Sequence, residues 1–214
     1  MIVVVFKLIA VFIISYFIGS IPTGYIIVKL LKKIDIRKTG SGSTGATNVK
    51  RILGTKWFFT VMLIDALKGF LPVWWCIHHV DFYNYYDERT NIYWEFRGLS
   101  PVCAALAVLI GHSKSVFLGF TGGKSVASGI GTIMALSWPA GITAAVIWGI
   151  ITFFTKYVSA GSIIAVTLTP ILMQAFESNY YYFVYACICA AYIILMHKDN
   201  IKRLIDGTES KVRK

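Results

Sequence analysis

Long runs of apolar residues, separated by short polar stretches, dominate this chain. The runs predict seven helical segments, at residues 2–31, 57–77, 99–111, 124–137, 138–154, 158–176 and 180–196. A helix that crosses the hydrocarbon core of a membrane needs ~20 apolar residues, so the third, fourth and fifth segments are short or broken elements. Gly19 and Pro22 are expected to bend the first segment. The pattern therefore predicts an all-α fold, a polytopic membrane helix bundle with seven spans.

The composition argues against a soluble protein. Of 214 residues, 57% are hydrophobic and 14% are charged, and the mean hydropathy is +0.67. A soluble domain of this size needs a far more polar surface. No linker divides the chain, so we expect a single domain over residues 1–214. The net charge of +11 could suggest nucleic acid, but the basic residues lie beside apolar spans, and no nucleic-acid partner is expected.

Charged residues between the apolar runs predict an orientation. The stretch 29–56 contains eight Lys or Arg residues against one Asp, and the tail after His197 contains six more. The stretch 78–98 is acidic on balance and rich in tyrosine. Cytoplasmic loops carry the excess of Lys and Arg in membrane proteins. The N-terminus is therefore predicted to lie outside and the C-terminus in the cytoplasm.

The first candidate for binding chemistry is the stretch 40–51, which reads GSGSTGATNVKR. Glycine lets backbone N–H groups turn toward an anion, and the side chains of Ser41, Thr47 and Asn48 add polar groups. Arg51 can hold a phosphate through two N–H groups at once. The stretch indicates a phosphate-binding loop. The alternative is a flexible solvated loop, because small polar residues are common in such loops.

The second candidate opens the fourth apolar segment with Gly122, Gly123 and Lys124. The spacing fails the nucleotide P-loop motif, since the preceding Gly119 is one residue too close and no strand comes before it. A helix N-terminus with glycines and a lysine nevertheless suits phosphate. The alternative is a basic anchor on the cytoplasmic side of the span.

Two more polar groups fall on the same predicted side of the membrane. Ser159 and Ser162 open the sixth segment, where either could be only an N-cap. His197 and Asn200 follow the seventh segment, where they could belong to a solvated amphipathic tail. A histidine at that place could also act as a base near neutral pH.

One charged pair lies inside an apolar segment. Asp65 and Lys68 are three residues apart, on one face of a helix and close enough to neutralise each other. Charges within spans are costly and are usually paired or functional. A structural ion pair and a role at the site both remain open.

Together these stretches resemble the bacterial acyl-phosphate:glycerol-3-phosphate acyltransferases, the PlsY family. The matching stretches follow one another in the family's order, at residues 40–51, 65–69, 111–127, 159–163 and 197–209. The first is similar to the family's Gly-Ser-Gly-Asn…Gly-Ala-Thr-Asn…Arg motif, and the second to its Asp-x-x-Lys-Gly signature. The chain departs from the pattern in several places. Ser43 stands where Asn is usual and Ser125 where Gly is usual. The stretch 113–115 replaces a more apolar one, and the acidic outer loop is longer than usual.

The resemblance implies an enzyme that moves an acyl chain from acyl phosphate to the sn-1 hydroxyl of glycerol 3-phosphate. The products are lysophosphatidic acid and inorganic phosphate, in the first step of phospholipid synthesis. The implied catalytic residues are Ser41, Arg51, His197 and Asn200. Phosphate contact is implied for Thr47, Asn48, Lys68, Gly122, Gly123 and Lys124, with Arg203 as a further cation. We add Ser162, from its place at a helix start.

The expected partners are glycerol 3-phosphate, acyl phosphate and membrane lipid. No cofactor and no metal are expected, because the carboxylates are scattered and lysine and arginine already supply positive charge. The resemblance implies a multi-pass protein of the bacterial plasma (inner) membrane, with its active site facing the cytoplasm. The alternative is a small membrane transporter of an organic phosphate, although no internal repeat is visible and the candidates lie at one face. A purely structural membrane protein leaves the polar stretches unexplained.

Overall fold

The computed structural model of the protein describes residues 2–80, 85–87, 92–94 and 97–212. In chain order, its elements are α1 (Ile2–Ser20), α2 (Thr23–Lys32), the 3-10 helix η1 (Ile36–Lys38), α3 (Ala46–Leu53), α4 (Thr55–His79), β1 (Tyr85–Asp87), β2 (Ile92–Trp94), α5 (Leu99–Ser113), the 3-10 helix η2 (Val116–Leu118), α6 (Val126–Leu136), α7 (Trp138–Thr155), α8 (Val158–Phe176), α9 (Tyr180–Met196) and α10 (Lys198–Ile205).

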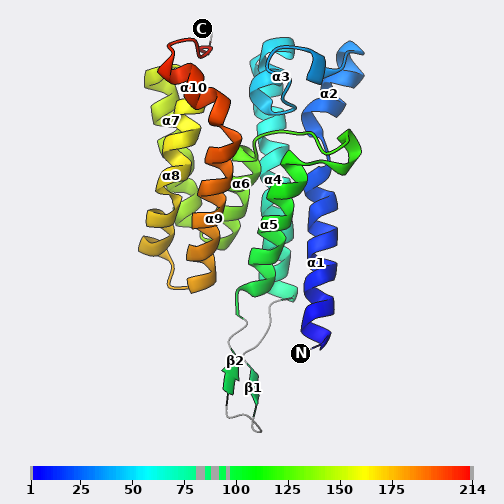
Figure 1. Ribbon diagram of the computed structural model, residues 1–214, viewed down its shortest axis with the longest axis vertical. Helices are drawn as coiled ribbons and strands as arrows, with labels where there is room; N and C mark the ends of the chain where they lie inside the picture. Colours follow the sequence, from blue (N-terminus) through cyan, green and yellow to red (C-terminus); the bar gives the residue numbers. More distant parts are fainter. Residues whose placement is uncertain (1, 81–84, 88–91, 95–96, 213–214) are drawn as a thin grey trace.

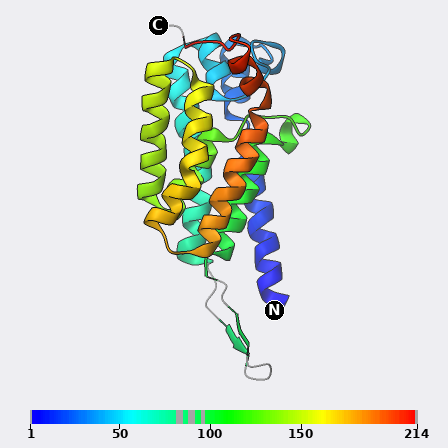
Figure 2. The same ribbon diagram turned by 60° about the vertical axis from the view of Figure 1, so that its left-hand side comes forward.

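The long helices stand side by side along the long axis of the molecule (Figure 1). Helix α1 packs against α5, α4 against both α5 and α6, and α7 against α8, which also contacts α9. Figure 2, in which α7 and α8 come forward, shows the same arrangement from another side. The short helices α2, α3 and α10 lie at the end of the bundle where the chain finishes, and the β1–β2 hairpin lies at the opposite end.

The prediction of a helical membrane bundle is confirmed. Helices α8 and α9 begin and end at the predicted residues, and the first segment breaks between Ser20 and Thr23, beside the predicted bend. The antiparallel hairpin, which pairs Tyr85 with Trp94, was not predicted. The rest of the 81–96 stretch, with most of its acidic residues, lies outside the described residues.

The helices differ in whether they are long enough to cross a membrane. By length and composition four candidates qualify, with 3–32 counted as one bent segment, and a fifth qualifies if α9 and α10, bent by 60°, form one span. Helix α5 has 15 residues and α6 has 11, so both fit the prediction of short elements. The number of crossings therefore stays a prediction.

Close backbone contacts hold the bundle together. A Cβ atom on Gly19 would lie 2.5 Å from the Val108 carbonyl oxygen, and one on Gly111 would lie 2.3 Å from the Tyr16 carbonyl oxygen. Helices α1 and α5 therefore touch backbone to backbone. Helices in lipid gain little from burying apolar side chains against each other, so such small-residue contacts provide much of their packing.

A small separate core lies under the basic end. Val28, Ile36, Val49 and Val61 are each fully buried and come from α2, η1, α3 and α4. This core fixes the two ends of the 39–45 segment, because η1 precedes the segment and α3 follows it. The loop that the sequence analysis proposed for phosphate binding therefore has a rigid base.

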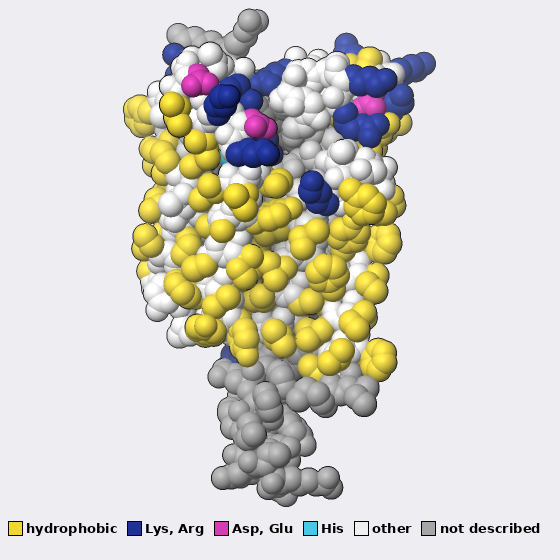
Figure 3. All heavy atoms as spheres, viewed as in Figure 1, with side chains coloured by type: hydrophobic (Ala, Val, Ile, Leu, Met, Phe, Trp, Pro, Cys, Tyr) yellow, Lys and Arg dark blue, Asp and Glu magenta, His cyan; other side chains and the backbone are white. Residues whose placement is uncertain are grey.

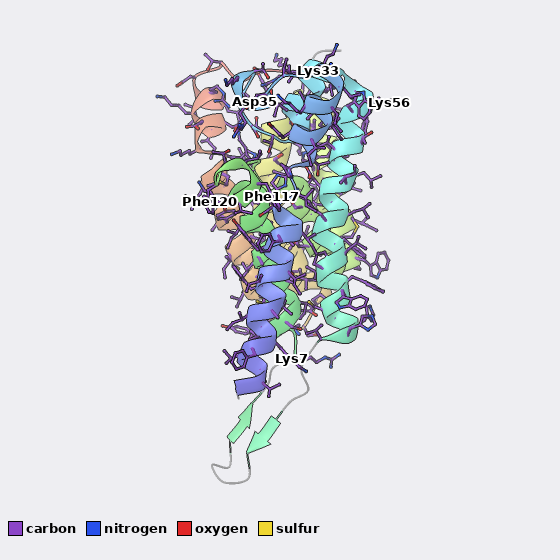
Figure 4. The ribbon with its side chains drawn as sticks, turned by 90° about the vertical axis from the view of Figure 1, so that its right-hand side faces the viewer. Lys7, Lys33, Asp35, Lys56, Phe117 and Phe120 are labelled. Carbon is purple, nitrogen blue, oxygen red and sulfur yellow. The ribbon has the colours of Figure 1, made fainter. Side chains whose placement is uncertain are left out.

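The surface divides into an apolar side and a basic end. Hydrophobic side chains cover most of the bundle's side, while Lys and Arg gather around α2, α3 and α10 (Figure 3). Lys33, Asp35 and Lys56 lie at this end, and Lys7 lies at the other (Figure 4). This distribution fits a bundle surrounded by lipid, with one charged face in water.

Candidate active site

The 39–45 segment, here called the Gly40 loop, is organised by one buried amide. Asn48, on α3, is 1% exposed. Its Oδ1 accepts a hydrogen bond from the Ser41 N–H at 3.2 Å, and its Nδ2 donates to the carbonyls of Ile36, Thr39 and Ser43 at 3.3, 3.0 and 2.9 Å. The predicted contact of Asn48 with phosphate would have to break these bonds.

Gly40 lets the loop close over this amide. Its φ is +59°, and a Cβ at this position would lie 2.2 Å from Asn48 Oδ1 and 3.7 Å from Arg51 Cδ. A side chain would therefore displace the amide and strain the backbone together. The stretch after the loop, predicted only as a polar loop, forms α3, which carries Thr47 half-buried in its first turn and Arg51 near its end.

Arg51, near the end of α3, is an exposed cation. Among the described residues no carboxylate forms an ion pair with it. Ser41, which follows Gly40 in the loop, is also exposed. Both side chains are therefore available to a substrate, in contrast to Asn48.

The loop between α5 and α6 brings in the second cation. Gly123 N–H donates to the His112 carbonyl at 3.1 Å, and a Cβ on Gly123 would lie 2.1 Å from His112 Nε2. The N–H of Gly123 is therefore already used. Gly122 packs on the His112 carbonyl in the same way, with 2.2 Å for an added Cβ, and Lys124 follows directly.

The backbone at Ser125, directly after this lysine, has a conformation that favours glycine. Its φ is +60°, in the left-handed region that costs a non-glycine residue free energy. The side chain is fully buried, and its hydroxyl donates to the Leu109 carbonyl at 2.8 Å. That hydrogen bond holds the serine in the conformation a glycine would adopt freely.

Five polar side chains from three parts of the chain form a network beside the end of α9. We call it the tail cluster: Lys124, Ser159, Asn200, Arg203 and Glu209. Glu209 Oε1 accepts hydrogen bonds from Ser159 Oγ at 2.8 Å and Asn200 Nδ2 at 2.7 Å, and its Oε2 accepts from Arg203 Nε at 2.7 Å. Asn200 Oδ1 in turn accepts from Lys124 Nζ. The predicted residues Lys124 and Asn200 are thus in direct contact.

Electrostatics link this cluster to the Gly40 loop. Burial raises the pKa of Glu209, but its three hydrogen bonds outweigh burial, so the pKa lies below the usual value and the carboxylate is ionised. Burial lowers the pKa of Lys124, and the positive charge of Arg203 lowers it further. The carboxylates of Glu209 and Asp199 raise this pKa, and the charge of Arg51 has the smallest effect, which lowers it. Arg51 therefore lies within electrostatic range of Lys124, and an anion between the two would relieve their repulsion.

His197 follows the last residue of α9 and is 4% exposed. Its Nδ1 lies 2.7 Å from the Ile193 carbonyl oxygen. Burial lowers the pKa of His197 to about 4, and the nearby charge of Lys124 acts in the same direction. The ring is therefore neutral at pH 7, and its bond to a carbonyl assigns the proton to Nδ1. Nε2 is left as a hydrogen-bond acceptor.

The interpretation of Ser159 and Ser162 as N-caps is wrong. Tyr157 occupies the N-cap of α8, and no side chain caps that end. Ser159 donates to the tail cluster. Ser162 donates to the Val158 carbonyl at 2.8 Å, accepts from Trp148 Nε1 at 3.3 Å, and lines a small apolar cavity between α6, α7, α8 and α9. Its hydroxyl is therefore engaged within the bundle.

Lys68 and Asp65 form the ion pair that the sequence left open. Lys68 Nζ lies 2.8 Å from Asp65 Oδ1 and donates to the Ile21 carbonyl, also at 2.8 Å. Both residues belong to α4, and both side chains are buried. The ammonium of Lys68 is thus occupied by protein partners.

Sequence reasoning did not assign Glu209, although this residue joins the tail cluster. Its partners lie up to 50 residues away in the chain. The available signal was weak, because Glu209 is one of three carboxylates in a basic tail, with Asp199 and Asp206. In the described part of the chain no three His, Cys, Asp or Glu side chains gather as metal ligands, and the expectation of a metal-free enzyme stays a prediction.

Known proteins are similar to this chain over most of its length. A profile of the family described as glycerol-3-phosphate acyltransferase matches residues 9–207. The glycerol-3-phosphate acyltransferase of Trichormus variabilis is 40% identical over 207 residues, which cover 95% of this chain and 91% of that protein. Glycerol-3-phosphate acyltransferase 2 of Thermotoga maritima is 39% identical over 205 residues, which cover 94% of each.

Solved structures extend the similarity to three dimensions. The crystal structure of PlsY (YgiH), an integral membrane glycerol 3-phosphate acyltransferase, in its glycerol 3-phosphate form has a TM-score of 0.85 and 32% identity, covering 96% of each chain. Its lysophosphatidic acid form has a TM-score of 0.82 and 31% identity, covering 96% of this chain and 95% of that one. This chain therefore belongs to the PlsY family of integral membrane glycerol-3-phosphate acyltransferases.

Proposed function

We propose that the protein transfers an acyl chain from acyl phosphate to the sn-1 hydroxyl of glycerol 3-phosphate. The products would be lysophosphatidic acid and inorganic phosphate. The observation that carries the proposal is the contact of Lys124 with Asn200, near the neutral His197 and within electrostatic range of Arg51, at the basic end of a membrane bundle. The names of the similar proteins supply the acceptor, and the chemistry of the site supports the donor.

The reaction must hold two phosphate groups near each other, and the cations meet that need. Unit charges ~4 Å apart repel by several kcal/mol at a protein surface, so binding both substrates requires positive charge between them. Arg51 is exposed and without a carboxylate partner among the described residues, and Lys124 is half-buried within electrostatic range of it. Their role is positioning and electrostatic stabilisation of the phosphates.

Acyl phosphate is an activated mixed anhydride, so transfer needs no covalent enzyme intermediate. The hydroxyl oxygen of glycerol 3-phosphate attacks the acyl carbonyl carbon, and the bond from that carbon to the phosphate oxygen breaks. His197 Nε2 accepts the hydrogen bond of the attacking hydroxyl and orients it. With a pKa of about 4, this ring is a weak base, so the proton ends on the leaving phosphate.

The remaining predicted residues divide into contact and support. Ser41 and Thr47 offer hydroxyl groups at the Gly40 loop, and Gly122 lets a phosphate approach the backbone before Lys124. Asn48, Lys68, Gly123 and Ser162, whose polar groups are engaged within the protein, would support these contacts from behind. Asn200 orients Lys124 through its amide.

We further propose that the chain crosses the membrane in seven spans, with α5 and α6 as short elements, and that the basic end faces the cytoplasm of a bacterial inner membrane. The excess of Lys and Arg at α2, α3 and α10 supports this orientation. A cysteine placed at Ser210, with the native cysteines removed, should react with an impermeant thiol reagent only after lysis. Reaction in intact cells would contradict the orientation. The complementary position, Asn84, lies outside the described residues.

The test of function is product formation by purified protein in detergent, where transport is impossible. Acyl phosphate and glycerol 3-phosphate should give lysophosphatidic acid at the same rate with or without EDTA. Acyl-CoA should not substitute, because the short loops offer no platform for its adenine and pantetheine. A lack of product would favour a carrier, and robust use of acyl-CoA, inhibition by EDTA or a trapped acyl-protein adduct would each defeat one part.

A further inference from the structure

A buried group of three side chains, which we call the Asp65 cluster, reaches both cation arms of the site. One arm is the Gly40 loop with α3, which carries Arg51, and the other is the loop between α5 and α6, which carries Lys124. Its members are Asp65 and Lys68 on α4 and His112 on α5, exposed by 2%, 7% and 7%. Lys68 Nζ lies 2.8 Å from Asp65 Oδ1, and His112 Nδ1 faces the same oxygen at 3.8 Å, beyond hydrogen-bond distance. One carboxylate oxygen therefore faces side chains from two helices.

On one side the cluster reaches the arm that carries Arg51. Lys68 Nζ donates to the carbonyl of Ile21, in the break between α1 and α2. Such breaks leave helix carbonyls that must find donors inside a membrane protein. Helix α2 in turn supports the Gly40 loop, because a Cβ on Gly24 would lie 2.0 Å from the Thr44 carbonyl oxygen. A shift of Lys68 would therefore move the base of that loop.

On the other side the cluster reaches the arm that carries Lys124. His112 binds the loop before Lys124 through both its backbone and its ring, since Gly123 N–H donates to its carbonyl and Gly123 packs against Nε2. The same ring faces Asp65 through Nδ1. A change in the charge or position of Asp65 would therefore act through His112 on Gly123, the residue before Lys124.

Helix α4 is also locked against α6, which follows Lys124. A Cβ on Gly69 would lie 2.2 Å from the Ser128 carbonyl oxygen, and one on Gly131 would lie 2.0 Å from the Ala66 carbonyl oxygen. These two contacts flank Lys68 along α4. The Asp65 cluster therefore stands in a part of the bundle that has no room to adjust around it.

We propose that Asp65, Lys68 and His112 are positioning residues that set the separation between Arg51 and Lys124, and that Lys68 does not bind substrate phosphate. The inference rests on the proposed function, because it assumes that those two cations hold the two phosphates. The ammonium of Lys68 is balanced by Asp65 and is nearly inaccessible. Its two protein partners, and not a phosphate, account for its position.

The test compares Asp65→Asn, Lys68→Met and the double variant in detergent, with kcat, KM and thermal unfolding measured for each. Each single change leaves an uncompensated buried charge or an unpaired polar group, so both stability and kcat should fall. The double variant removes both charges and should regain most of its thermal stability. Its kcat/KM should nevertheless stay at least tenfold below the wild type, because the Ile21 carbonyl has lost its donor and His112 no longer faces a carboxylate.

The alternatives give different patterns. A merely structural ion pair predicts that the double variant regains stability and activity together. A phosphate ligand predicts that Asp65→Asn keeps or improves the KM for glycerol 3-phosphate, since Lys68 is then released. Either pattern would overturn the proposal. Should the single variants not be recovered from the membrane, the double variant, with no net charge in the cluster, still decides between these outcomes. If none of them folds, Asp65→Glu keeps the charge, and full activity in that variant would also overturn the proposal.

The matched control is Tyr185→Phe. Tyr185 is fully buried in α9 and shares a hydrogen bond with Thr132, so its loss costs one buried polar contact elsewhere in the bundle. It should lower thermal stability and leave kcat/KM within about twofold of the wild type. The wild-type assay with acyl phosphate tests the proposed function by itself, so a failure there is distinguishable from a failure of the Asp65 cluster.

Discussion

Two arginines lie at the basic end, Arg51 next to the Gly40 loop and Arg203 in the tail cluster, but their surroundings differ. The loop is shaped by backbone bonds to the amide of Asn48, and Arg51 stays exposed beside it. The tail cluster is shaped by the carboxylate of Glu209, which pairs with Arg203. An arginine already committed to a carboxylate has less to offer an incoming phosphate. Under the proposed function, the difference predicts that Arg51 binds substrate, whereas Arg203 acts through the residues that it orders.

The largest effect is expected from Arg51→Ala. Loss of a charge-assisted donor costs about 3 kcal/mol of transition-state stabilisation, or roughly a hundredfold in kcat/KM. Arg51→Lys should recover only part of this, because a point charge does not reproduce the two parallel N–H groups of arginine. The measurement is kcat/KM for glycerol 3-phosphate with purified variants.

The neighbouring Lys50 provides the control for this variant. It is basic, belongs to the same helix and lies over the Phe58 ring, 5.7 Å from its centroid. Lys50→Ala should keep activity within about twofold, since surface charges contribute little. Near-normal activity in folded Arg51→Ala protein would remove Arg51 from the site and end the contrast with Arg203.

Asn48→Ala tests whether the loop depends on its amide. The change leaves three carbonyls and the Ser41 N–H without their partner, each in or near the buried core, and should cost about 2 kcal/mol. Hydrogen exchange in residues 36–45 should accelerate, and activity should fall because Ser41 and Arg51 lose their positions. Unchanged exchange would show that the loop is held by other contacts.

Arg203→Gln should have a smaller effect than Arg51→Gln. Glutamine can still donate one hydrogen bond to Glu209, so the tail cluster keeps its shape and loses about 1 kcal/mol. The two variants should be compared in one assay, at equal thermal stability. An equal or larger loss of kcat/KM at Arg203 would indicate that Arg203 contacts substrate, and would contradict the distinction between the two arginines.

The smallest effect concerns pH. Burial lowers the pKa of His197 from 6.5 to about 4, so the folded protein keeps the ring neutral while the unfolded chain takes a proton below 6.5. The free energy of unfolding should therefore fall as the pH drops from about 6.5 toward 4. Titration of His197 cannot produce a loss of activity between pH 5 and 7. His197→Gln should thus lower the rate but keep the shape of the profile, and a lost acid limb would contradict this.

Segments with long apolar patterns were predictable, because a helix that crosses lipid must be long enough to span it and apolar along its length. Helix α8 follows Val158–Phe176 as predicted, and the break after Ser20 follows from Pro22. Helix α3 was not predicted, since its eight residues carry a polar loop composition and depend on the small core beneath them. Local patterns do not report such tertiary support.

Parts of the site were predictable for a similar reason. Lys124 and Asn200 were recognised by motif, and they are in contact. The inward direction of Asn48 and the central place of Glu209 were not foreseen. Both depend on partners that only the folded chain brings together, such as Ser159, 50 residues before Glu209. Residue type signals that a group is polar, but its burial decides whether it faces substrate or protein.

The backbone contact between α1 and α5 has a consequence for biosynthesis. The contact joins Gly19 to Val108, about 90 residues later in the chain, which a ribosome takes roughly ten seconds to add. During that interval α1 must persist in the bilayer without α5, which its 19 residues, apolar except for Lys7 and a few small polar positions, allow. Helix α5, with 15 residues, is too short to be stable by itself and must find α1 already in place. The order of synthesis thus delivers the self-sufficient segment first and the dependent one second.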